Sequence, residues 1–114
     1  MLKIYFKSTC ATCKTALDLI KKNTDEDYEL VEYLVDIPSQ KEIKEILKML
    51  GLKAFDLVRT KEQLYKTKFE GKKITNAQCI KILHENPILI ERPIVVKDGK
   101  AIIGRPIEKI LDII

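Results

Sequence analysis

The sequence lacks any apolar run long enough to cross a membrane and any segment typical of a secretory signal. A membrane-spanning helix needs about 20 consecutive apolar residues, and no run in the 114 residues approaches that length. The segment Met1–Phe6 has no apolar core and no small-residue cleavage site, so it favours a strand over a signal peptide. We therefore expect a cytoplasmic protein with no membrane partner.

Cysteine and histidine are scarce. Three cysteines are an odd number in a short chain without a secretory signal, which argues against the disulfide framework of a secreted protein. Structural zinc needs four ligands, and the candidates Cys79 and His84, the single histidine, lie in an expected helix without ligand spacing. We expect no metal site and no bound cofactor, with Cys79 in the core.

The sequence also lacks a block of charge of one sign. Its 21 basic and 17 acidic residues are interspersed, and the formal net charge is +4. Direct nucleic-acid binding has little support, because no basic stripe is interleaved with aromatic residues. With 46% hydrophobic residues and no repeat or linker, the chain fits one compact domain.

Hydrophobic periodicity predicts a strand, a helix and a second strand in the first third. Apolar and polar side chains alternate over 2–6. A helix is expected to follow Cys10 and to end at 23–25, before a strand at about 28–35. One helical stripe is formed by Cys13, Ala16, Leu17 and Ile20. This order is typical of a right-handed parallel unit.

The middle of the chain is predicted to be a helical insertion at about 39–87. Capping-box patterns start two helices, at Ser39–Glu42 and Thr75–Gln78. Gly51 is typical of a helix end, and Asn86-Pro87 ends the last helix of the insertion.

Strand patterns return in the last third. Strands at 94–96 and 101–103 flank Asp98-Gly99, which is a strong hairpin signal. Pro106 stands at the expected first position of a final helix. The predicted order is β-α-β, then helices, then β-β-α, in one α/β domain spanning 1–114.

A C-x-x-C pattern, Cys10 to Cys13, lies where the first strand passes into the first helix. Unpaired N–H groups and the dipole at a helix N-terminus stabilise an anion. The pKa of a free thiol is ~8.5 and can fall to about 3.5–7.5 in such a place. We interpret Cys10 as a reactive thiolate, and the alternative is a thiol that merely caps the helix.

Cys13 belongs to the apolar stripe of the same helix, so we expect it to be more buried and less acidic than Cys10. Two interpretations stay open. Cys13 is either the resolving thiol of a redox pair with Cys10 or a small hydrophobic residue of the core.

Three arginines stand next to expected elements. Arg59 ends an apolar stretch, Arg92 precedes the third strand, and Arg105 follows the fourth. The arginine fork donates paired hydrogen bonds to a tetrahedral oxyanion and is not neutralised by deprotonation. For any one of them alone, a surface charge is the simpler interpretation.

Four motifs resemble the arsenate reductase (ArsC) family, which also includes the Spx regulators and YffB-type proteins. They are residues 5–14, 57–61, 91–96 and 103–106, and they occur in the family's order over the whole chain. The resemblance implies a thioredoxin-like fold with a helical insertion. It implies that Cys10 is the nucleophile, that Arg59, Arg92 and Arg105 surround an oxyanion, and that a cis Arg92-Pro93 bond lies opposite the cysteine.

Three positions depart from the reductase motif. Phe6, Lys7 and Ser8 stand where these enzymes usually carry His-Asn-Pro, so Lys7 or the arginines would have to lower the thiol pKa instead of the histidine. Cys13 replaces a small residue and matches the C-x-x-C of Spx. Arg105, in contrast, is typical of the reductases.

The resemblance implies two candidate functions. The first is an oxidoreductase in which Cys10 attacks arsenate, with glutathione as co-substrate and glutaredoxin or thioredoxin as reducing partner. The second is an Spx-like redox regulator that binds the C-terminal domain of the RNA polymerase α-subunit. Gly51 lies near the position of a glycine at that contact in Spx, although a helix C-cap explains it equally well.

Overall fold

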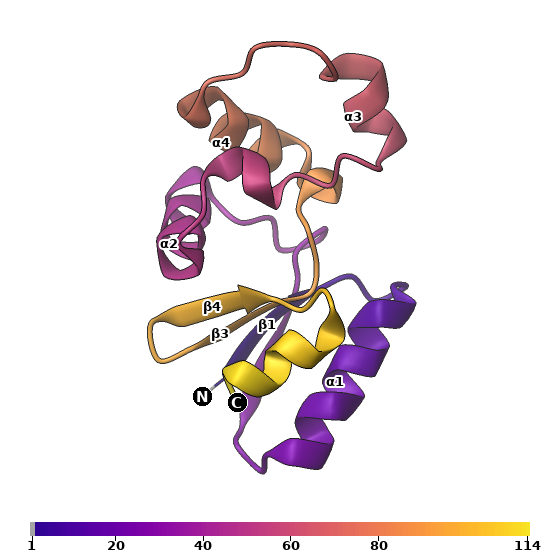
Figure 1. Ribbon diagram of the computed structural model, residues 1–114, viewed down its shortest axis with the longest axis vertical. Coiled ribbons are helices and arrows are strands. Elements are labelled where there is room, and N and C mark those ends of the chain that lie inside the picture. Colours follow the sequence, from indigo (N-terminus) through magenta and orange to yellow (C-terminus); the bar gives the residue numbers. More distant parts are fainter. Residues whose placement is uncertain (1) are drawn as a thin grey trace. The chain divides into compact units, whose positions relative to one another are not determined.

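The computed structural model describes residues 2–114, which form two compact units (Figure 1). One unit holds the chain up to Asp36 together with Arg92–Ile114 and contains all the strands, and the other, Ile37–Glu91, is helical. The bounds of the helical unit are close to those of the predicted insertion, 39–87. The assignment of 1–114 to one domain stays a prediction. Within residues 2–114, none of the helices has the length and apolarity that crossing a bilayer requires.

The strand-containing unit has the predicted order β-α-β followed by β-β-α. Its elements are β1 (Leu2–Phe6), α1 (Ala11–Asn23), β2 (Tyr28–Glu32), β3 (Ile94–Lys97), β4 (Lys100–Ile103) and the 3₁₀-helix η3 (Ile107–Asp112). The sheet order is β2-β1-β3-β4, with β1 parallel to β2 and antiparallel to β3. This arrangement confirms the thioredoxin-like fold.

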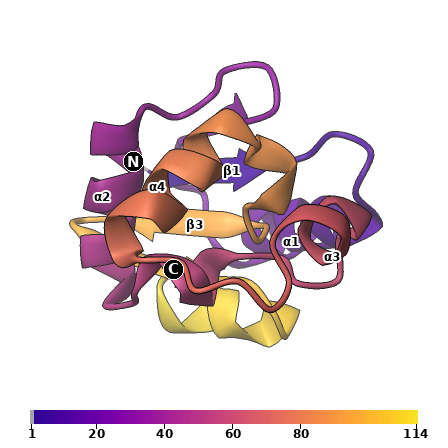
Figure 2. The same ribbon diagram turned by 90° about the horizontal axis from the view of Figure 1, so that it is seen from above.

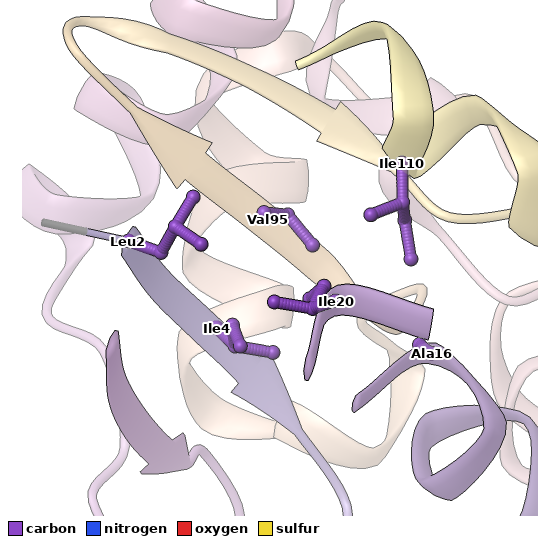
Figure 3. Close-up of a cluster of buried hydrophobic side chains, with 6 residues drawn as sticks. All are labelled: Leu2, Ile4, Ala16, Ile20, Val95 and Ile110. Atoms are coloured by element: carbon purple, nitrogen blue, oxygen red, sulfur yellow. The ribbon is translucent and has the colours of Figure 1, made fainter. Parts of the chain in front are cut away.

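Helices α1 and η3 pack on the sheet through a buried apolar cluster (Figure 3). The cluster consists of Leu2, Ile4, Ala16, Ile20, Val95 and Ile110. Alternate residues of β1 meet residues four apart on α1, as the periods of a strand and a helix require. Each large side chain stabilises the fold by roughly 1.5–3 kcal/mol when buried. The cluster therefore holds β1 against α1, and Cys10 lies in the connection between these two elements.

Strand β2 ends earlier than predicted, at Glu32 instead of Val35. The backbone N–H groups of Val35 and Asp36 both donate to the Glu32 carbonyl, at 2.9 and 2.8 Å, so the chain turns there. Val35 is 77% exposed. Its β-branched side chain is typical of a strand, but no buried surface is available for it to pack against, so the strand does not extend to it.

The final helix also differs from the prediction, because η3 is a 3₁₀-helix and Pro106 is its N-cap residue. The Lys109 N–H donates to the Pro106 carbonyl at 3.1 Å, three residues back. Apolar residues recur every three positions, at Ile107, Ile110 and Ile113, which suits a helix with three residues per turn. Isoleucine also has a lower α-helix propensity than leucine.

The β3–β4 turn confirms the hairpin prediction. Asp98 and Gly99 both have positive φ, 50° and 78°. Two consecutive residues of positive φ make the turn whose twist matches that of the flanking strands, and Asp-Gly is a preferred pair for it.

The helical unit contains α2 (Gln40–Leu50), η1 (Ala54–Leu57), α3 (Gln63–Lys68), α4 (Asn76–Glu85) and η2 (Pro87–Leu89). Its helix starts are those predicted, because Ser39 Oγ accepts from the Glu42 N–H at 3.1 Å and Thr75 and Gln78 form a reciprocal capping box. Gly51 ends α2 in the left-handed conformation with φ 69°. Helices α2 and α4 lie side by side (Figure 2).

Candidate functional site

Cys10 lies at the turn between β1 and α1 and is the N-cap residue of the helix, in an extended conformation. Its N–H donates to the Lys7 carbonyl at 3.0 Å, and its carbonyl accepts the first helical bond, from Lys14, at 3.2 Å. Cys10 is partly exposed, whereas Cys13 is buried. The position is therefore the helix N-terminus that the sequence predicted.

Arg92 and Arg105 both lie at this sulfur. Arg105 Nη2 is 3.9 Å from Cys10 Sγ, and Arg105 Nε donates to the Arg92 carbonyl at 2.6 Å. Arg92 is only 5% exposed, and its guanidinium acts on the Cys10 thiolate by hydrogen bonding and by charge. Two of the three predicted arginines thus surround the thiol within one unit.

The peptide bonds that follow both arginines are cis. The Arg92-Pro93 bond is cis as expected, and the Arg105-Pro106 bond is a second one that was not expected. The Gly104 N–H donates to the Pro93 carbonyl at 2.9 Å and ties the two segments together.

The pKa of Cys10 is lowered to about 7. Partial burial raises it, but the backbone N–H and thiol of Cys13 and the guanidinium of Arg92 together outweigh burial. The Cys13 backbone N–H, in the first turn of α1, makes the largest of these lowering contributions. Phe6 occupies the position of the motif's histidine. Lys7 and the arginines were the two expected substitutes for it, and Arg92 is the one that lowers the pKa of Cys10.

Cys13 has the opposite character. It is 3% exposed, and burial together with the neighbouring Cys10 thiolate raises its pKa to about 11, although the Lys7 backbone N–H and Arg92 oppose this. Both thiols are free. The structure thus places Cys13 in the core and also beside Cys10, so the two interpretations of this residue are compatible.

Arg59 belongs to the helical unit. Its N–H donates to the Leu89 carbonyl at 2.7 Å, and its guanidinium pairs with Glu62 at 3.4 Å and Glu91 at 3.6 Å. Two carboxylates therefore hold this side chain within its own unit. Its participation at the Cys10 site stays a prediction.

Two residues at the end of β2 were not found by sequence reasoning. Tyr33 is fully buried, and its hydroxyl accepts from Arg92 Nη1 at 3.2 Å. Glu32 Oε2 accepts from the Ser8 N–H at 2.7 Å, a bond that the proline of the reductase motif has no N–H to make. A tyrosine within the strand expected at about 28–35 looks like an ordinary core residue, so no local signal marks it.

The other candidate metal ligands, Cys79 and His84, lie on α4 in the helical unit. Cys79 is buried, and burial raises its pKa. His84 Nδ1 lies 2.8 Å from the Pro38 carbonyl. Among residues 2–114, no group of three or more ligand side chains is arranged to hold a metal ion.

Comparisons with known proteins identify the family of this chain. Residues 5–113 match the model of the ArsC family. The chain is 39% identical to the uncharacterized protein YfgD of Escherichia coli, over 99% of this chain and 96% of that protein. It is 35% identical to an arsenate reductase of Neisseria meningitidis, over 96% and 94%.

The fold gives the same result. The structure of an arsenate reductase from Vibrio cholerae superposes with a TM-score of 0.93 at 34% identity, covering 99% of this chain and 97% of that one. The similarity extends over nearly all of both chains and includes the segments that carry Cys10, Arg92 and Arg105. This chain therefore belongs to the ArsC family.

Proposed function

We propose that this protein is a thiol-dependent oxidoreductase in which the Cys10 thiolate attacks arsenate held by arginine side chains. One observation carries the proposal: Cys10, with a pKa of about 7, has the Arg105 guanidinium at 3.9 Å and the buried Arg92 guanidinium beside it. A nucleophile and fixed cationic donors at one point suit a tetrahedral oxyanion. The arsenate reductases among its relatives support the choice of arsenate.

The first step forms a bond between sulfur and arsenic. The Cys10 thiolate attacks As(V), and one arsenate oxygen is protonated and leaves as water. The guanidiniums of Arg92 and Arg105 neutralise the charge on the remaining oxygens. The product is a covalent Cys10–arsenate adduct in which arsenic is still As(V).

The second step transfers two electrons to arsenic. The Cys13 thiolate attacks the Cys10 sulfur, a disulfide forms, and the S–As bond breaks with its electron pair on arsenic, which leaves as arsenite. The Cys10 thiolate raises the pKa of Cys13. Adduct formation moves this negative charge from the Cys10 sulfur to the arsenate oxygens, which the guanidiniums of Arg92 and Arg105 offset, so it favours ionisation of Cys13 when the second thiolate is needed.

Glutathione is the other candidate nucleophile for this step. Its thiolate attacks the Cys10 sulfur in the same way. Arsenite then departs, and a mixed disulfide between Cys10 and glutathione remains. Glutaredoxin would then reduce the mixed disulfide, whereas thioredoxin would reduce the internal Cys10–Cys13 disulfide. Either route needs the reducing thiol pool of the cytoplasm, where we place the protein.

Arg59 is proposed as a third oxyanion ligand. The support is its place in one of the family motifs, Leu57–Lys61. Replacement by alanine is expected to lower kcat/KM for arsenate without abolishing Cys10 alkylation, because Arg92 and Arg105 remain.

Steady-state reduction of arsenate tests the proposal. Wild-type protein is assayed with glutathione and glutaredoxin and, separately, with thioredoxin and its reductase. Cys10→Ser should be inactive with both donors, whereas Cys79→Ser, the matched control for a thiol outside the site, should keep its activity. If the wild-type protein turns over arsenate with neither donor, arsenate is not the substrate.

A Cys13→Ser variant separates the two reducing routes. We expect turnover with thioredoxin to be lost, because no internal disulfide can form, while turnover with glutathione and glutaredoxin persists. Undiminished turnover with thioredoxin would show that Cys13 is not the resolving thiol.

The second candidate function is a redox-sensing regulator that binds the C-terminal domain of the RNA polymerase α-subunit. The paired thiols, Cys10 with a lowered pKa and Cys13 with a raised one, favour it, because such a pair can switch between dithiol and disulfide. Gly51 adds no support, since its φ of 69° at the end of α2 already requires glycine there. Pull-down of that domain by reduced and by oxidised protein tests this candidate, and retention in neither state contradicts it.

A further inference from the structure

We propose that Tyr33 is a positioning residue for the chemistry of Cys10, because its hydroxyl holds the Arg92 guanidinium at the sulfur. The contact is direct: Arg92 Nη1 donates to Tyr33 Oη at 3.2 Å. The inference rests on the proposed function only in taking Cys10 as the reactive group.

Tyr33 is itself fixed at both ends. Its ring is fully buried, and its backbone N–H donates to the Phe6 carbonyl, at the end of β1, at 3.4 Å. A buried hydroxyl needs hydrogen-bond partners, since leaving it without one costs ~1–3 kcal/mol. The oxygen that receives Arg92 therefore has a fixed place relative to the loop that carries Cys10.

Tyr33 suits the task of positioning Arg92 because its hydroxyl is an uncharged hydrogen-bond partner. Arg59 pairs with two carboxylates, Glu62 and Glu91, which offset its charge. Tyr33 is neutral in its ordinary protonated form, so it orients the Arg92 guanidinium without cancelling its positive charge. That charge stays available to the thiolate and to an incoming oxyanion.

The effect extends to the second arginine. The carbonyl of Arg92 accepts the Arg105 Nε–H at 2.6 Å, and Arg105 Nη2 reaches Cys10 Sγ at 3.9 Å. A long arginine side chain loses considerable rotamer freedom when it is held in one place. Tyr33 therefore holds the buried Arg92 side chain, and the backbone carbonyl of Arg92 in turn holds Arg105.

The test is the pH dependence of Cys10 alkylation in Tyr33→Phe, with the modified site mapped by mass spectrometry. We expect the apparent pKa of Cys10 to rise by roughly 0.5 unit, which lowers the alkylation rate at pH 6 about 3-fold. Tyr28→Phe is the matched control, because it removes a hydroxyl from the same end of the chain, on β2, where Tyr28 packs against the apolar cluster. Its alkylation profile should equal that of the wild type.

A double variant asks whether Tyr33 acts through Arg92. In an Arg92→Met background, Tyr33→Phe should cause no further shift in the pKa of Cys10, because the guanidinium that it positions is gone. An equal shift in both backgrounds, or no shift in the wild-type background, would overturn the proposal. Alkylation requires no arsenate, so an inactive protein that still shows the expected shifts would contradict the proposed substrate and not the role of Tyr33.

A second probe covers the case in which Tyr33→Phe does not fold. Incorporation of 3-fluorotyrosine at position 33 keeps the ring and the hydroxyl but makes the oxygen a weaker acceptor. The apparent pKa of Cys10 should then rise by a smaller amount in the same direction, and an unchanged profile would overturn the proposal.

Discussion

At the scale of single residues, two thiols three positions apart have opposite chemistry. Cys10 lies at the helix N-terminus with guanidiniums beside it, and its pKa falls to about 7. Cys13 faces the core one turn later, and its pKa rises to about 11. An accessible thiolate next to a protonated buried thiol is the arrangement that sequential attack by Cys10 and then Cys13 requires.

Arg105 gives the residue-scale prediction. Arg105→Lys keeps the positive charge but loses the Nε–H that donates to the Arg92 carbonyl, as well as the fork that binds an oxyanion. A hydrogen bond to a charged group is worth ~1.5–3 kcal/mol, so we expect kcat/KM for arsenate to fall roughly 10- to 100-fold. Steady-state kinetics measure this, and thermal melts check that the fold is intact. Wild-type kinetics in Arg105→Lys would mean that charge alone suffices.

At the scale of elements, the site depends on close packing between the β4–η3 connection and the segment that precedes β3. Gly104 is the first residue of this connection, and an added Cβ there would be 3.0 Å from Ile110 Cδ1 and 3.1 Å from Pro93 Cγ. The Ile110 side chain is in the buried cluster and the proline ring is rigid, so neither yields easily. Gly104 is thus required by space and not by its backbone conformation.

Gly104→Ala is therefore expected to lower the free energy of unfolding by ~1–3 kcal/mol, the usual cost of overpacking. Urea denaturation measures the change. Ile110→Val removes the nearest atom, so the cost of Gly104→Ala should be smaller in that background. Equal costs in both backgrounds would contradict the steric explanation.

The elements also show what the sequence could predict. The starts of α2 and α4 and the β3–β4 turn follow from local signals at Ser39, Thr75 and Asp98-Gly99, which act within three or four residues. The 3₁₀ form of η3 was missed because apolar spacings of three and four are both compatible with an α-helix pattern.

The site, in contrast, depends on contacts between residues that are far apart in the sequence. The order of motifs allowed Cys10, Arg92 and Arg105 to be named together, and the structure brings these three residues to one place. The Tyr33–Arg92 hydrogen bond joins residues 59 positions apart. No local pattern encodes such a contact, because it depends on β2 ending beside β1 and on the loop before β3.

At the scale of the whole molecule, the positive charge at the site is local. The helical unit holds 11 of the 21 basic and 7 of the 17 acidic residues, so it carries the entire net charge of +4. The unit that contains Cys10 is therefore neutral overall. Its anion-stabilising character comes from the start of α1 and from the placement of Arg92 and Arg105, not from a general excess of basic residues.

Stability at alkaline pH provides a whole-molecule prediction. Cys13 has a raised pKa in the folded state, so above the ordinary thiol pKa of ~8.5 the unfolded chain loses a proton that the folded chain keeps, and stability falls with rising pH. Cys10 has a lowered pKa, so it is ionised in the folded state and mostly ionised in the unfolded state above pH 9, and it adds only a small slope of the opposite sign. Under reducing conditions, the free energy of unfolding of the wild type should therefore fall more steeply between pH 9 and 10.5 than that of Cys13→Ala. Equal slopes would contradict the raised pKa of Cys13.

The most direct test of the account is the rate of Cys10 alkylation as a function of pH in the reduced wild-type protein, read at the level of the single cysteine. A thiolate stabilised by the first turn of α1 and by Arg92 should give a midpoint near pH 7, with Cys13 unreactive throughout the neutral range. A midpoint at ~8.5, the value of an ordinary thiol, would show that neither the helix nor the arginines hold this sulfur as an anion.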